Sequence, residues 1–335
     1  MSSARAEAEA PRIAVVVLNW NGWRESIVGI ASLLDQAYRN YSLVILDNGS
    51  TDGSADCLAD WLHGRGAANR VAREEKRVAP SCVVWAEGRS VILLRNATNE
   101  GFAGGNNIAI HYALESLQPD YVFLLNSDAI LDSQCLQQCV DLARDHNGAI
   151  VGAVVKGADR TTVLFTGADP LRELFFFSAP SPESGLPGFW ETGRAEGSGE
   201  LIAAGFLRER HARWGYFLDP RLFMYCEDSD LALSARRLGR KVLMTKAAVI
   251  YHSVAQSSGG PGNPIQYYYL TRNRIFLARR WLSPLGKILF HAYYAPTRIA
   301  RLMQRYLQGK PDVALAIWQG LSDGYRGRAG KWGRQ

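Results

Sequence analysis

Long apolar runs are absent from this sequence. No stretch of about 18 uncharged apolar residues occurs, and the opening MSSARAEAEAPR has no apolar core of a signal peptide. We therefore predict neither a membrane-spanning helix nor a secretory signal. Cysteine is also scarce: the chain has five in 335 residues and no CxxC pair, which argues against a disulfide framework. These absences predict a cytoplasmic protein in a reducing environment.

Apolar residues are plentiful, however: 47% of the chain is hydrophobic, enough for a large core. Short runs of valine, isoleucine and leucine alternate with segments of helical periodicity. Purely apolar runs are typical of strands buried on both faces of a parallel sheet. We therefore predict an α/β fold with a mostly parallel, Rossmann-like sheet flanked by helices. The predicted strands are Ile13–Leu18, Leu43–Leu46, Val91–Leu94, Tyr121–Leu125 and Ile150–Val155.

Three segments lack this pattern. Residues 1–11 are expected to be disordered. Residues 63–90 are charged, rich in small residues and aperiodic, so we predict a surface insertion without a chemical role. Residues 157–200 are rich in glycine, proline and serine, which predicts long, mobile loops beside the site.

Polar blocks follow the predicted strands, at the sheet edge where open α/β proteins bind ligands. Asp47 directly follows one strand and opens the turn-forming DNGSTDGS. An Asx turn is the simpler explanation, but a carboxylate placed there can also accept an N–H from a pyrimidine base. In NEGFAGGNN (99–107), glycines such as Gly104 allow close backbone approach, and Asn107 offers an amide to ribose or phosphate. We predict that the helix after this loop begins near Gly105.

A candidate metal site lies in the segment NSD. Asn126 and Asp128 follow the strand ending at Leu125, and oxygen ligands there suit Mg²⁺ or Mn²⁺ bridging a diphosphate. Capping of the following helix is the alternative role for Asp128, although Asp132 is better placed for it. His252, at the end of AAVIYH, is either structural or a further contact to metal or phosphate.

A candidate general base lies in YCEDSDL (225–231). Glu227 and Asp228 precede a helical segment, where acidic residues also stabilise the helix dipole. The bulky residues before them favour a partly desolvated carboxylate, and desolvation makes a carboxylate a stronger base. We therefore predict that Asp228 deprotonates an acceptor hydroxyl.

Positive charge is concentrated at the C-terminal end. Residues 272–335 hold thirteen Lys or Arg and two Asp, a net +11 in a chain of +6, which leaves −5 for the rest. Apolar and aromatic residues alternate with these charges over 285–308, which predicts a basic amphipathic helix suited to an anionic membrane surface. A solvated helix packed on its own domain is the alternative. No nucleic-acid motif accompanies the charge, so we predict no nucleic-acid partner.

In their order, LNWNG (18–22), LDNGSTDGS (46–54), NEGFAGGNN, NSD and LDPRLFMYCEDSDL (218–231) resemble the motifs of family 2 glycosyltransferases with the GT-A fold, including the rhamnosyltransferase-like group. The resemblance implies inversion at the anomeric carbon by direct displacement. The first position of the metal motif is Asn126 rather than aspartate, which leaves Asp128 as its carboxylate. The implied roles are nucleotide binding by Leu18, Asn19, Asn21, Asp47, Gly104 and Asn107; metal binding by Asp128 and His252; contact with diphosphate or acceptor by Asn126, Glu227, Arg272 and Arg274; and catalysis by Asp228.

The resemblance also implies a domain organisation and a function. Residues 12–282 would form the GT-A domain, with a nucleotide-binding half at 12–130 and an acceptor half at 131–282, and 283–335 would form a basic helical extension. We expect transfer of a single sugar, with rhamnose as a candidate, from a UDP- or dTDP-sugar to a glycan or lipid-linked hydroxyl in cell-surface polysaccharide synthesis. The protein would be cytoplasmic and peripheral at the inner face of the membrane.

Three other classes of protein fit the sequence less well. A nucleotidyltransferase typically has a glycine-rich signature and a basic residue directly after its first strand, and NWNGW differs from this. A dinucleotide dehydrogenase needs GxGxxG at the same place, and GFAGGNN comes two strands too late. A non-catalytic nucleotide-sugar-binding or membrane scaffold module would not need Asp47, Asp128 and Asp228 together.

Overall fold

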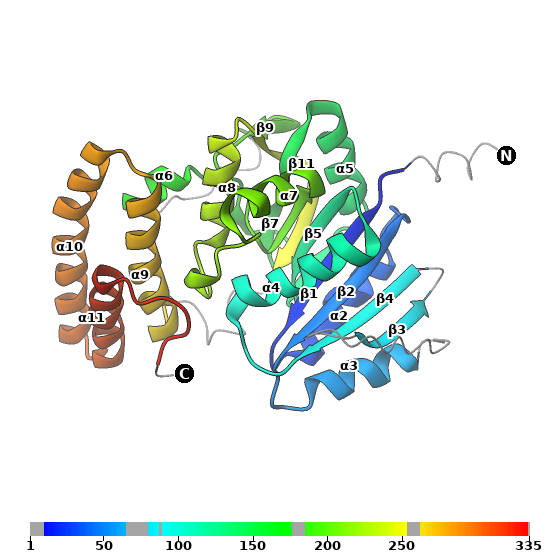
Figure 1. Cartoon of the computed structure of the whole chain (residues 1–335), viewed down its shortest axis with the longest axis horizontal. Coiled ribbons are helices and arrows are strands. Elements are labelled where there is room, and N and C mark those ends of the chain that lie inside the picture. Colours follow the sequence, from blue (N-terminus) through cyan, green and yellow to red (C-terminus); the bar gives the residue numbers. More distant parts are fainter. Residues whose placement is uncertain (1–9, 65–79, 87–88, 176–184, 253–261, 334–335) are drawn as a thin grey trace.

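The computed structural model describes residues 10–64, 80–86, 89–175, 185–252 and 262–333. Its centre is one mixed sheet of eleven strands, with helices on both sides (Figure 1). β8 (Val163–Phe165) pairs with β7, and β9 (Phe189–Glu191) pairs with β11. The remaining strands follow the order β3 (Pro80–Ala86), β4 (Arg89–Asn96), β2 (Tyr41–Asn48), β1 (Ile13–Asn19), β5 (Tyr121–Asn126), β10 (Gly199–Ala203), β7 (Gly148–Gly157), β11 (Lys241–His252) and β6 (Ala129–Leu131).

The five predicted strands are present as β1, β2, β4, β5 and β7, and all run in one direction. The sheet is less parallel than predicted, because β10 lies antiparallel between β5 and β7. The sequence analysis did not predict β10. Its five residues, GELIA, include a glycine and a glutamate and so do not form an apolar run.

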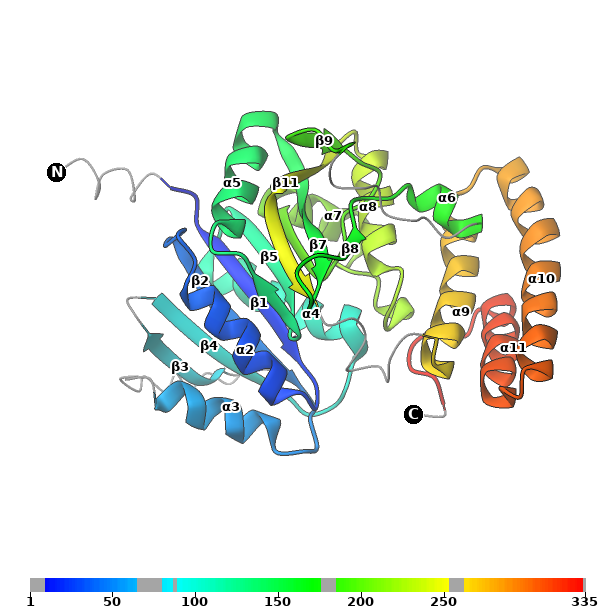
Figure 2. The same ribbon diagram turned by 180° about the vertical axis from the view of Figure 1, so that it is seen from behind.

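Both faces of the sheet are covered by helices. The helices α2 (Trp23–Leu34), α3 (Ser54–His63) and α5 (Cys135–His146) cover one face (Figure 2). The opposite face carries α4 (Gly101–Tyr112) and α7 (Ala204–Trp214). Successive residues of β1 pack into the two cores in turn, with Val15 in one and Val16 in the other. This alternation explains why the strand is apolar at every position.

Two segments for which no helix or strand was predicted contain short helices or strands. Within 63–90, β3 forms an edge strand antiparallel to β4, because PSCVVWA is rich in strand-forming residues. Within 157–200, the structure forms β8, α6 (Pro170–Phe175), β9 and the start of β10. The prediction of long loops over residues 157–200 was therefore wrong where these elements form. Residues 65–79, 87–88 and 176–184 lie outside the described residues.

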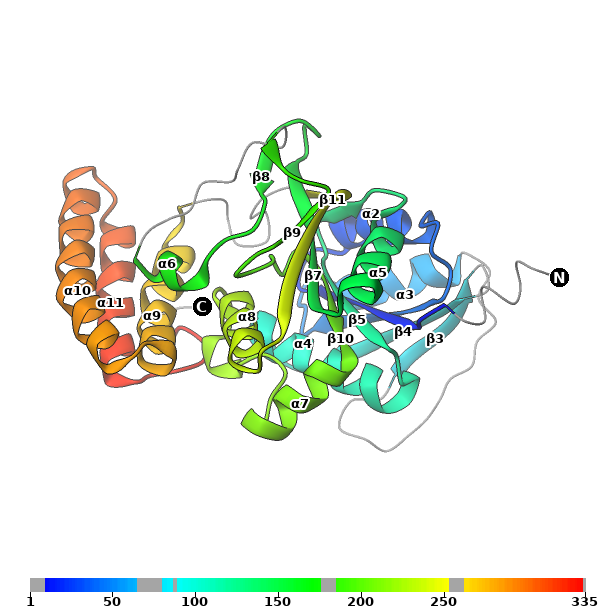
Figure 3. The same ribbon diagram turned by 90° about the horizontal axis from the view of Figure 1, so that it is seen from above.

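The C-terminal helices form a layer beside the sheet (Figures 1 and 3). It consists of α9 (Pro264–Trp281), α10 (Pro284–Leu307) and α11 (Pro311–Arg326), and it shares a core with α6 and α8 (Glu227–Arg237). Each of the three helices has proline in its first turn, and Asn263 and Ser283 cap α9 and α10 through their side chains. α9, assigned above to the catalytic domain, thus packs together with the helical extension.

The amphipathic helix predicted over 285–308 is α10, and its apolar residues lie on two sides. Phe290 and Tyr294 are buried in the core shared with α9 and α11. A second set is at least half exposed and recurs at helical spacing along the outer side. We call this set the outer stripe; it comprises Leu285, Ile288, Leu289, Ile299, Met303, Tyr306 and Leu307.

The N-terminal prediction concerns mainly residues 1–9, which lie outside the described residues. The carbonyl groups of Ala10 and Pro11 accept hydrogen bonds from Asn40 and Tyr38, so these two residues are held in place rather than disordered. Of the helices in the described part of the chain, none has the length and apolar composition needed to cross a bilayer.

Candidate active site

The carboxyl ends of β2, β1 and β5 lie side by side at one edge of the sheet. Asn19 at the end of β1 is in register with Asp47 at the end of β2. On the other side of β1, Leu18 is in register with Asn126 at the end of β5. The parallel arrangement thus brings together polar blocks that are far apart in the sequence, as ligand sites in such sheets require.

Asp47 is buried and held by a network of hydrogen bonds. Its Oδ1 accepts from the Asn19 amide at 2.8 Å and from the Ser50 hydroxyl at 2.6 Å, and its Oδ2 accepts from the Ser50 backbone N–H at 3.1 Å. Asn19 accepts in turn from the Ser26 hydroxyl, and the Asn21 backbone N–H donates to Ser50. The predicted nucleotide residues of LNWNG and LDNGS therefore form one cluster, in which Asn19 positions Asp47.

The predicted metal residues form a second cluster. His252 Nε2 lies 2.9 Å from Asp128 Oδ1 and 3.5 Å from Asn126 Nδ2. Burial acts to lower the pKa of His252, but the hydrogen bond and charge of Asp128, with the charge of Glu196, raise it above its usual value. The strands β5, β6 and β11 create this contact, because His252 pairs with Ala129 directly after Asp128.

The donors of this cluster suit a divalent cation that takes further ligands from a substrate. Among the described residues, no group of three or more His, Cys, Asp or Glu could enclose a metal. The cluster instead offers the Asp128 carboxylate, the His252 imidazole and the Asn126 Oδ1, which is buried without a hydrogen-bond partner. Mg²⁺ and Mn²⁺ bound through few protein ligands commonly complete their coordination with substrate phosphates.

Asp228 is the second residue of α8, and it forms an ion pair with Arg194. Its other oxygen, Oδ1, accepts from the Ser229 backbone N–H at 2.6 Å. Arg194 also binds both carboxylate oxygens of Glu173, at 2.8 and 2.9 Å. The side chains of Arg194 and Asp228 are only 11% and 17% exposed. The pair therefore fixes the orientation of the Asp228 side chain, whose carboxylate form can accept a proton.

Further carboxyl groups surround this pair. Burial, and then the charge of Asp228, raise the pKa of Glu227 to about 8. Burial, the charge of Asp228 and that of Glu196 raise the pKa of Glu200 to about 8, against the opposing charge of Arg194. Burial also raises the pKa of Glu196. Several acidic groups thus share one arginine, so part of the cluster holds protons at neutral pH.

The metal and base clusters line one cavity of about 270 Å³. Asn126, Asp128 and His252 line it together with Glu227 and Asp228. We call this space the catalytic cavity. Asp47 lies on the same sheet edge, two strands from β5, but does not line the cavity. The remaining lining residues are Phe102, Glu196, Gly197, Ser198, Met224, Tyr225, Cys226 and Gln266.

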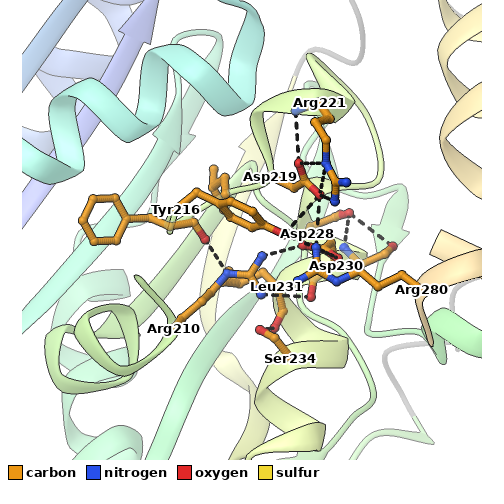
Figure 4. Close-up of polar contacts among 12 residues, drawn as sticks. Arg210, Tyr216, Asp219, Arg221, Asp228, Asp230, Leu231, Ser234 and Arg280 are labelled. Carbon is orange, nitrogen blue, oxygen red and sulfur yellow. Dashed lines mark hydrogen bonds and ion pairs between the residues drawn. The ribbon is translucent and has the colours of Figure 1, made fainter. Parts of the chain in front are cut away.

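A buried ion network fixes the helix that carries Asp228 (Figure 4). Asp230 accepts from Arg210 at 2.5 Å and from the Trp281 indole at 2.7 Å, and both Arg210 and Asp230 are almost fully buried. Arg280 of α9 lies 3.1 Å from Asp219 and 3.6 Å from Asp230. Helices α7, α8 and α9 are thereby tied together, so the position of Asp228 depends on all three.

The two arginines predicted to face the diphosphate lie on α9. Arg272 is fully buried and donates to the carbonyls of Leu222 and Gly330 at 2.8 and 2.5 Å. Its guanidinium thus joins α9 to the segment before α8 and to the C-terminal segment, outside the catalytic cavity. Arg274 lines a separate cavity between α9 and α10.

The glycine-rich block also differs from its prediction. Helix α4 begins at Gly101 rather than near Gly105, so Gly104 and Asn107 lie on a helix. Asn107 is joined to the backbone of Leu218 by two hydrogen bonds of 2.7 and 2.8 Å, which occupy both ends of its amide. A side chain on Gly105 would meet Leu18 at 2.6 Å. The block therefore packs α4 closely against the carboxyl ends of β1 and β2.

The sequence analysis missed Arg194, Glu196 and Glu200. They lie in TGRAEGSGE, which we read as loop because of its glycines. The available signal was the clustering of three charged residues directly before an apolar pair, Leu201 and Ile202, in a segment otherwise made of small residues.

Together, the fold and the site define an α/β protein that presents carboxylates along one sheet edge. The sequence profile described as glycosyl transferase family 2 matches residues 14–192. The chain belongs to this family, which confirms the resemblance seen in its motifs.

Two curated relatives are similar to parts of the chain. The low-salt glycan biosynthesis hexosyltransferase Agl10 of Haloferax volcanii is 24% identical over 198 residues, covering 58% of this chain and 62% of the relative. An uncharacterized glycosyltransferase of Haemophilus influenzae is 29% identical over 128 residues, covering 38% of this chain and 40% of the relative. The chain therefore spans less than two thirds of the length of either relative.

Solved structures show the same fold. The mannosyltransferase PcManGT from Pyrobaculum calidifontis, in complex with GDP-Man and Mn²⁺, has a TM-score of 0.58 at 15% identity and covers 95% of this chain and 88% of its own. S. aureus TarS 1-349 with UDP-GlcNAc has a TM-score of 0.55 at 14% identity, covering 92% and 81%. At this level of identity the similarity concerns the fold alone, and it confirms the predicted GT-A class.

Proposed function

We propose that this chain is an inverting glycosyltransferase that transfers one sugar from a UDP- or dTDP-sugar to a hydroxyl of a glycan or lipid-linked acceptor. The observation that carries the proposal is the shared catalytic cavity, because Asp128 and Asp228 both line this one space. One carboxylate is thus available for the donor and the other for the acceptor. Rhamnose is the sugar suggested by the motifs, and cell-surface polysaccharide synthesis is the setting.

On the donor side, Asp47 accepts an N–H of the pyrimidine base at the sheet edge, held by Asn19 and Ser50. Asp128, His252 and Asn126 Oδ1 hold Mg²⁺ or Mn²⁺ beside the diphosphate. When bound, such a cation supplies positive charge that stabilises the departing nucleoside diphosphate. Three relatives of known fold, in complex with UDP-GlcNAc, with GDP-Man and Mn²⁺, or with UDP, GalNAc and Mn²⁺, support a nucleotide-sugar donor and a divalent ion.

On the acceptor side, Asp228 takes the proton of the incoming hydroxyl. The oxygen then forms its bond to the anomeric carbon as the bond to the diphosphate breaks, so the configuration inverts in a single displacement. Arg194 orients Asp228 through their ion pair, and the Asp230 network fixes the helix that carries it. Glu227, protonated at neutral pH, lies beside Asp228 without adding a second negative charge.

We further propose that the protein works at the inner face of the cell membrane. The outer stripe supports this, since seven apolar side chains along one helix side are at least half exposed. The alternative to membrane contact was a helix packed on its own domain. Phe290 and Tyr294 do pack inward, so α10 has both a packed and an exposed apolar side. The positive charge of residues 272–335 favours anionic lipids.

The test is to incubate the purified protein with UDP-, dTDP- and GDP-sugars and Mn²⁺, and to measure release of nucleoside diphosphate. We expect release from one donor class, and loss of release in Asp228→Asn with nucleotide binding nearly unchanged. Asp52→Asn, which removes an exposed carboxylate near Asp47, is the matched control. Donor binding without turnover by the unmodified protein, with every acceptor class offered, would favour the non-catalytic module. Equal loss of binding and release in Asp228→Asn would mean that Asp228 is structural.

A further inference from the structure

A second cavity, of about 640 Å³, lies between α9 and α10. We call it the α9–α10 groove. Three arginines line it: Arg274 from α9, and Arg298 and Arg301 from α10. None of the described residues that line the groove is Asp or Glu; the other polar ones are neutral, such as Tyr267 and Gln304.

The positive charge of α10 in this groove is not neutralised by protein carboxylates. Among the described residues, no ion pair joins Arg298 or Arg301 to Asp or Glu, and Arg301 donates only to the neutral oxygens of Gln304 and Tyr267, at 2.8 and 3.4 Å. The Nε of Arg298 is buried without a hydrogen-bond partner. Such an unpaired buried donor is costly unless something else accepts from it.

The electrostatic environment of Arg298 also indicates positive charge that is not neutralised. Burial lowers the pKa of Arg298, the Tyr294 hydroxyl opposes the shift, and the charges of Arg274 and Arg301 lower it further. On the same helix, Arg305 has a buried Nε without a partner and donates to the Tyr267 hydroxyl at 2.6 Å. A bound anion would relieve the mutual repulsion and accept from the buried donors.

The position of the groove links it to the catalytic cavity. Gln266, in the first turn of α9, lines both spaces. Arg274 is close enough to Cys226, a lining residue of the catalytic cavity, for its charge to lower the pKa of that thiol against the larger effect of burial. On α10, Arg298 and Arg301 alternate in sequence with Ile299 and Met303 of the outer stripe. The groove therefore shares a lining residue with the catalytic cavity, and two of its arginines lie on the helix that carries the outer stripe.

We propose that the α9–α10 groove binds the phosphate group of an anionic lipid, and that this phosphate belongs to the lipid carrier of the acceptor. The assignment rests on the proposed function, since it requires a lipid-linked acceptor. Arginine donors match phosphate oxygens in pairs, which suits the guanidinium groups here. With its phosphate in the groove and its chain along the outer stripe, the carrier presents its sugar toward Asp228. A phospholipid headgroup of the bilayer is the other source of the same chemistry.

The test compares two double variants with equal loss of charge. Arg298→Gln with Arg301→Gln alters the groove, whereas Lys310→Gln with Arg326→Gln removes two exposed charges outside it. Binding of farnesyl phosphate, with farnesol as the phosphate-free control, is measured by calorimetry in EDTA without vesicles. We expect the groove variant to bind farnesyl phosphate about tenfold more weakly or worse, and the control variant to bind like the unmodified protein.

A second arm separates the two sources. Both variants are tested on vesicles of phosphatidylcholine with about one third phosphatidylglycerol. If only the groove variant loses vesicle binding while farnesyl phosphate binds equally to all proteins, the acceptor assignment is overturned in favour of a bilayer headgroup. If the two variants never differ, the groove is not a phosphate site and the proposal fails.

The melting temperature shows whether each variant is folded. Binding of farnesyl phosphate and of vesicles is measured without a sugar donor, so these readouts are independent of the proposed activity. A protein that binds farnesyl phosphate through the groove but releases no nucleotide from any donor would refute the activity and leave the groove assigned. A protein that transfers sugar, yet whose groove variant binds farnesyl phosphate normally, would refute the groove alone.

Discussion

Replacing Glu200 by glutamine should stabilise the protein at neutral pH and leave it unaltered in acid. Glu200 lies on β10, is 2% exposed, and shares the charge of Arg194 with Asp228 and Glu196. Burial and the charges of Asp228 and Glu196 raise its pKa from an ordinary value of 4.5 to about 8, against the opposing charge of Arg194. Glutamine keeps the shape of the side chain and removes the ionisable group.

The sign follows from the proton count. Between pH 4.5 and about 8 the unfolded chain loses the Glu200 proton while the folded chain keeps it. The folded state then binds more protons, so the free energy of unfolding falls as pH rises through this window. At about 1.4 kcal/mol per pH unit, the loss of unfolding free energy caused by Glu200 reaches about 3 kcal/mol at pH 7 and stays below about 1 kcal/mol at pH 5.

The assay is urea unfolding followed by tryptophan fluorescence, at about pH 5 and about pH 7. The free energy of unfolding of Glu200→Gln relative to the unmodified protein should grow by about 2 to 3 kcal/mol between these two values. Glu191→Gln, which removes an exposed carboxylate on β9, should show no such growth. A difference that is the same at both pH values would refute the reasoning, because it would mean that Glu200 ionises in the folded protein as it does in the unfolded one.

Three further predictions concern other parts of the molecule. Asp128→Ala should weaken Mn²⁺-dependent UDP binding at least about tenfold in calorimetry; unchanged metal dependence would count against its role as a ligand. Asp230→Asn leaves Arg210 buried without its counter-charge and should cost about 3 to 5 kcal/mol in urea unfolding; a loss below 1 kcal/mol would show that the pair is dispensable. Leu289→Glu should reduce binding to anionic vesicles, whereas Val28→Glu, an equally exposed apolar position on α2, should not; equal effects would remove the outer stripe from the membrane contact.

Much of the fold could be predicted from the sequence because strands buried on both faces must be apolar at every position. Val15 and Val16 enter opposite cores, so successive positions of the strand that carries them are apolar. The site residues that end such strands, Asp47 and Asn126, could be located for the same reason. The segment after an apolar run in a parallel sheet lies at the ligand edge.

The rest depends on contacts that sequence patterns do not record. Arg194 becomes part of the site only because β10 pairs beside β5, and the five residues of β10 carry too little apolar pattern to reveal this. Arg272 and Arg274 are two residues apart on one helix, yet one is enclosed by backbone carbonyls and the other lines a groove. Because both residues are arginine, the residue type could not predict these different environments.

The reversed direction of β10 has a consequence for how the proposed substrate specificity could diversify. Because β10 begins where β5 ends, the residues just before it bring Glu196, Gly197 and Ser198 to the wall of the catalytic cavity, and these three belong to neither of the two sheet cores. Changes in length or composition there would reshape the walls around an incoming sugar while the main scaffold stays intact. Natural variation and directed evolution alike should therefore find new substrates most readily in this short stretch.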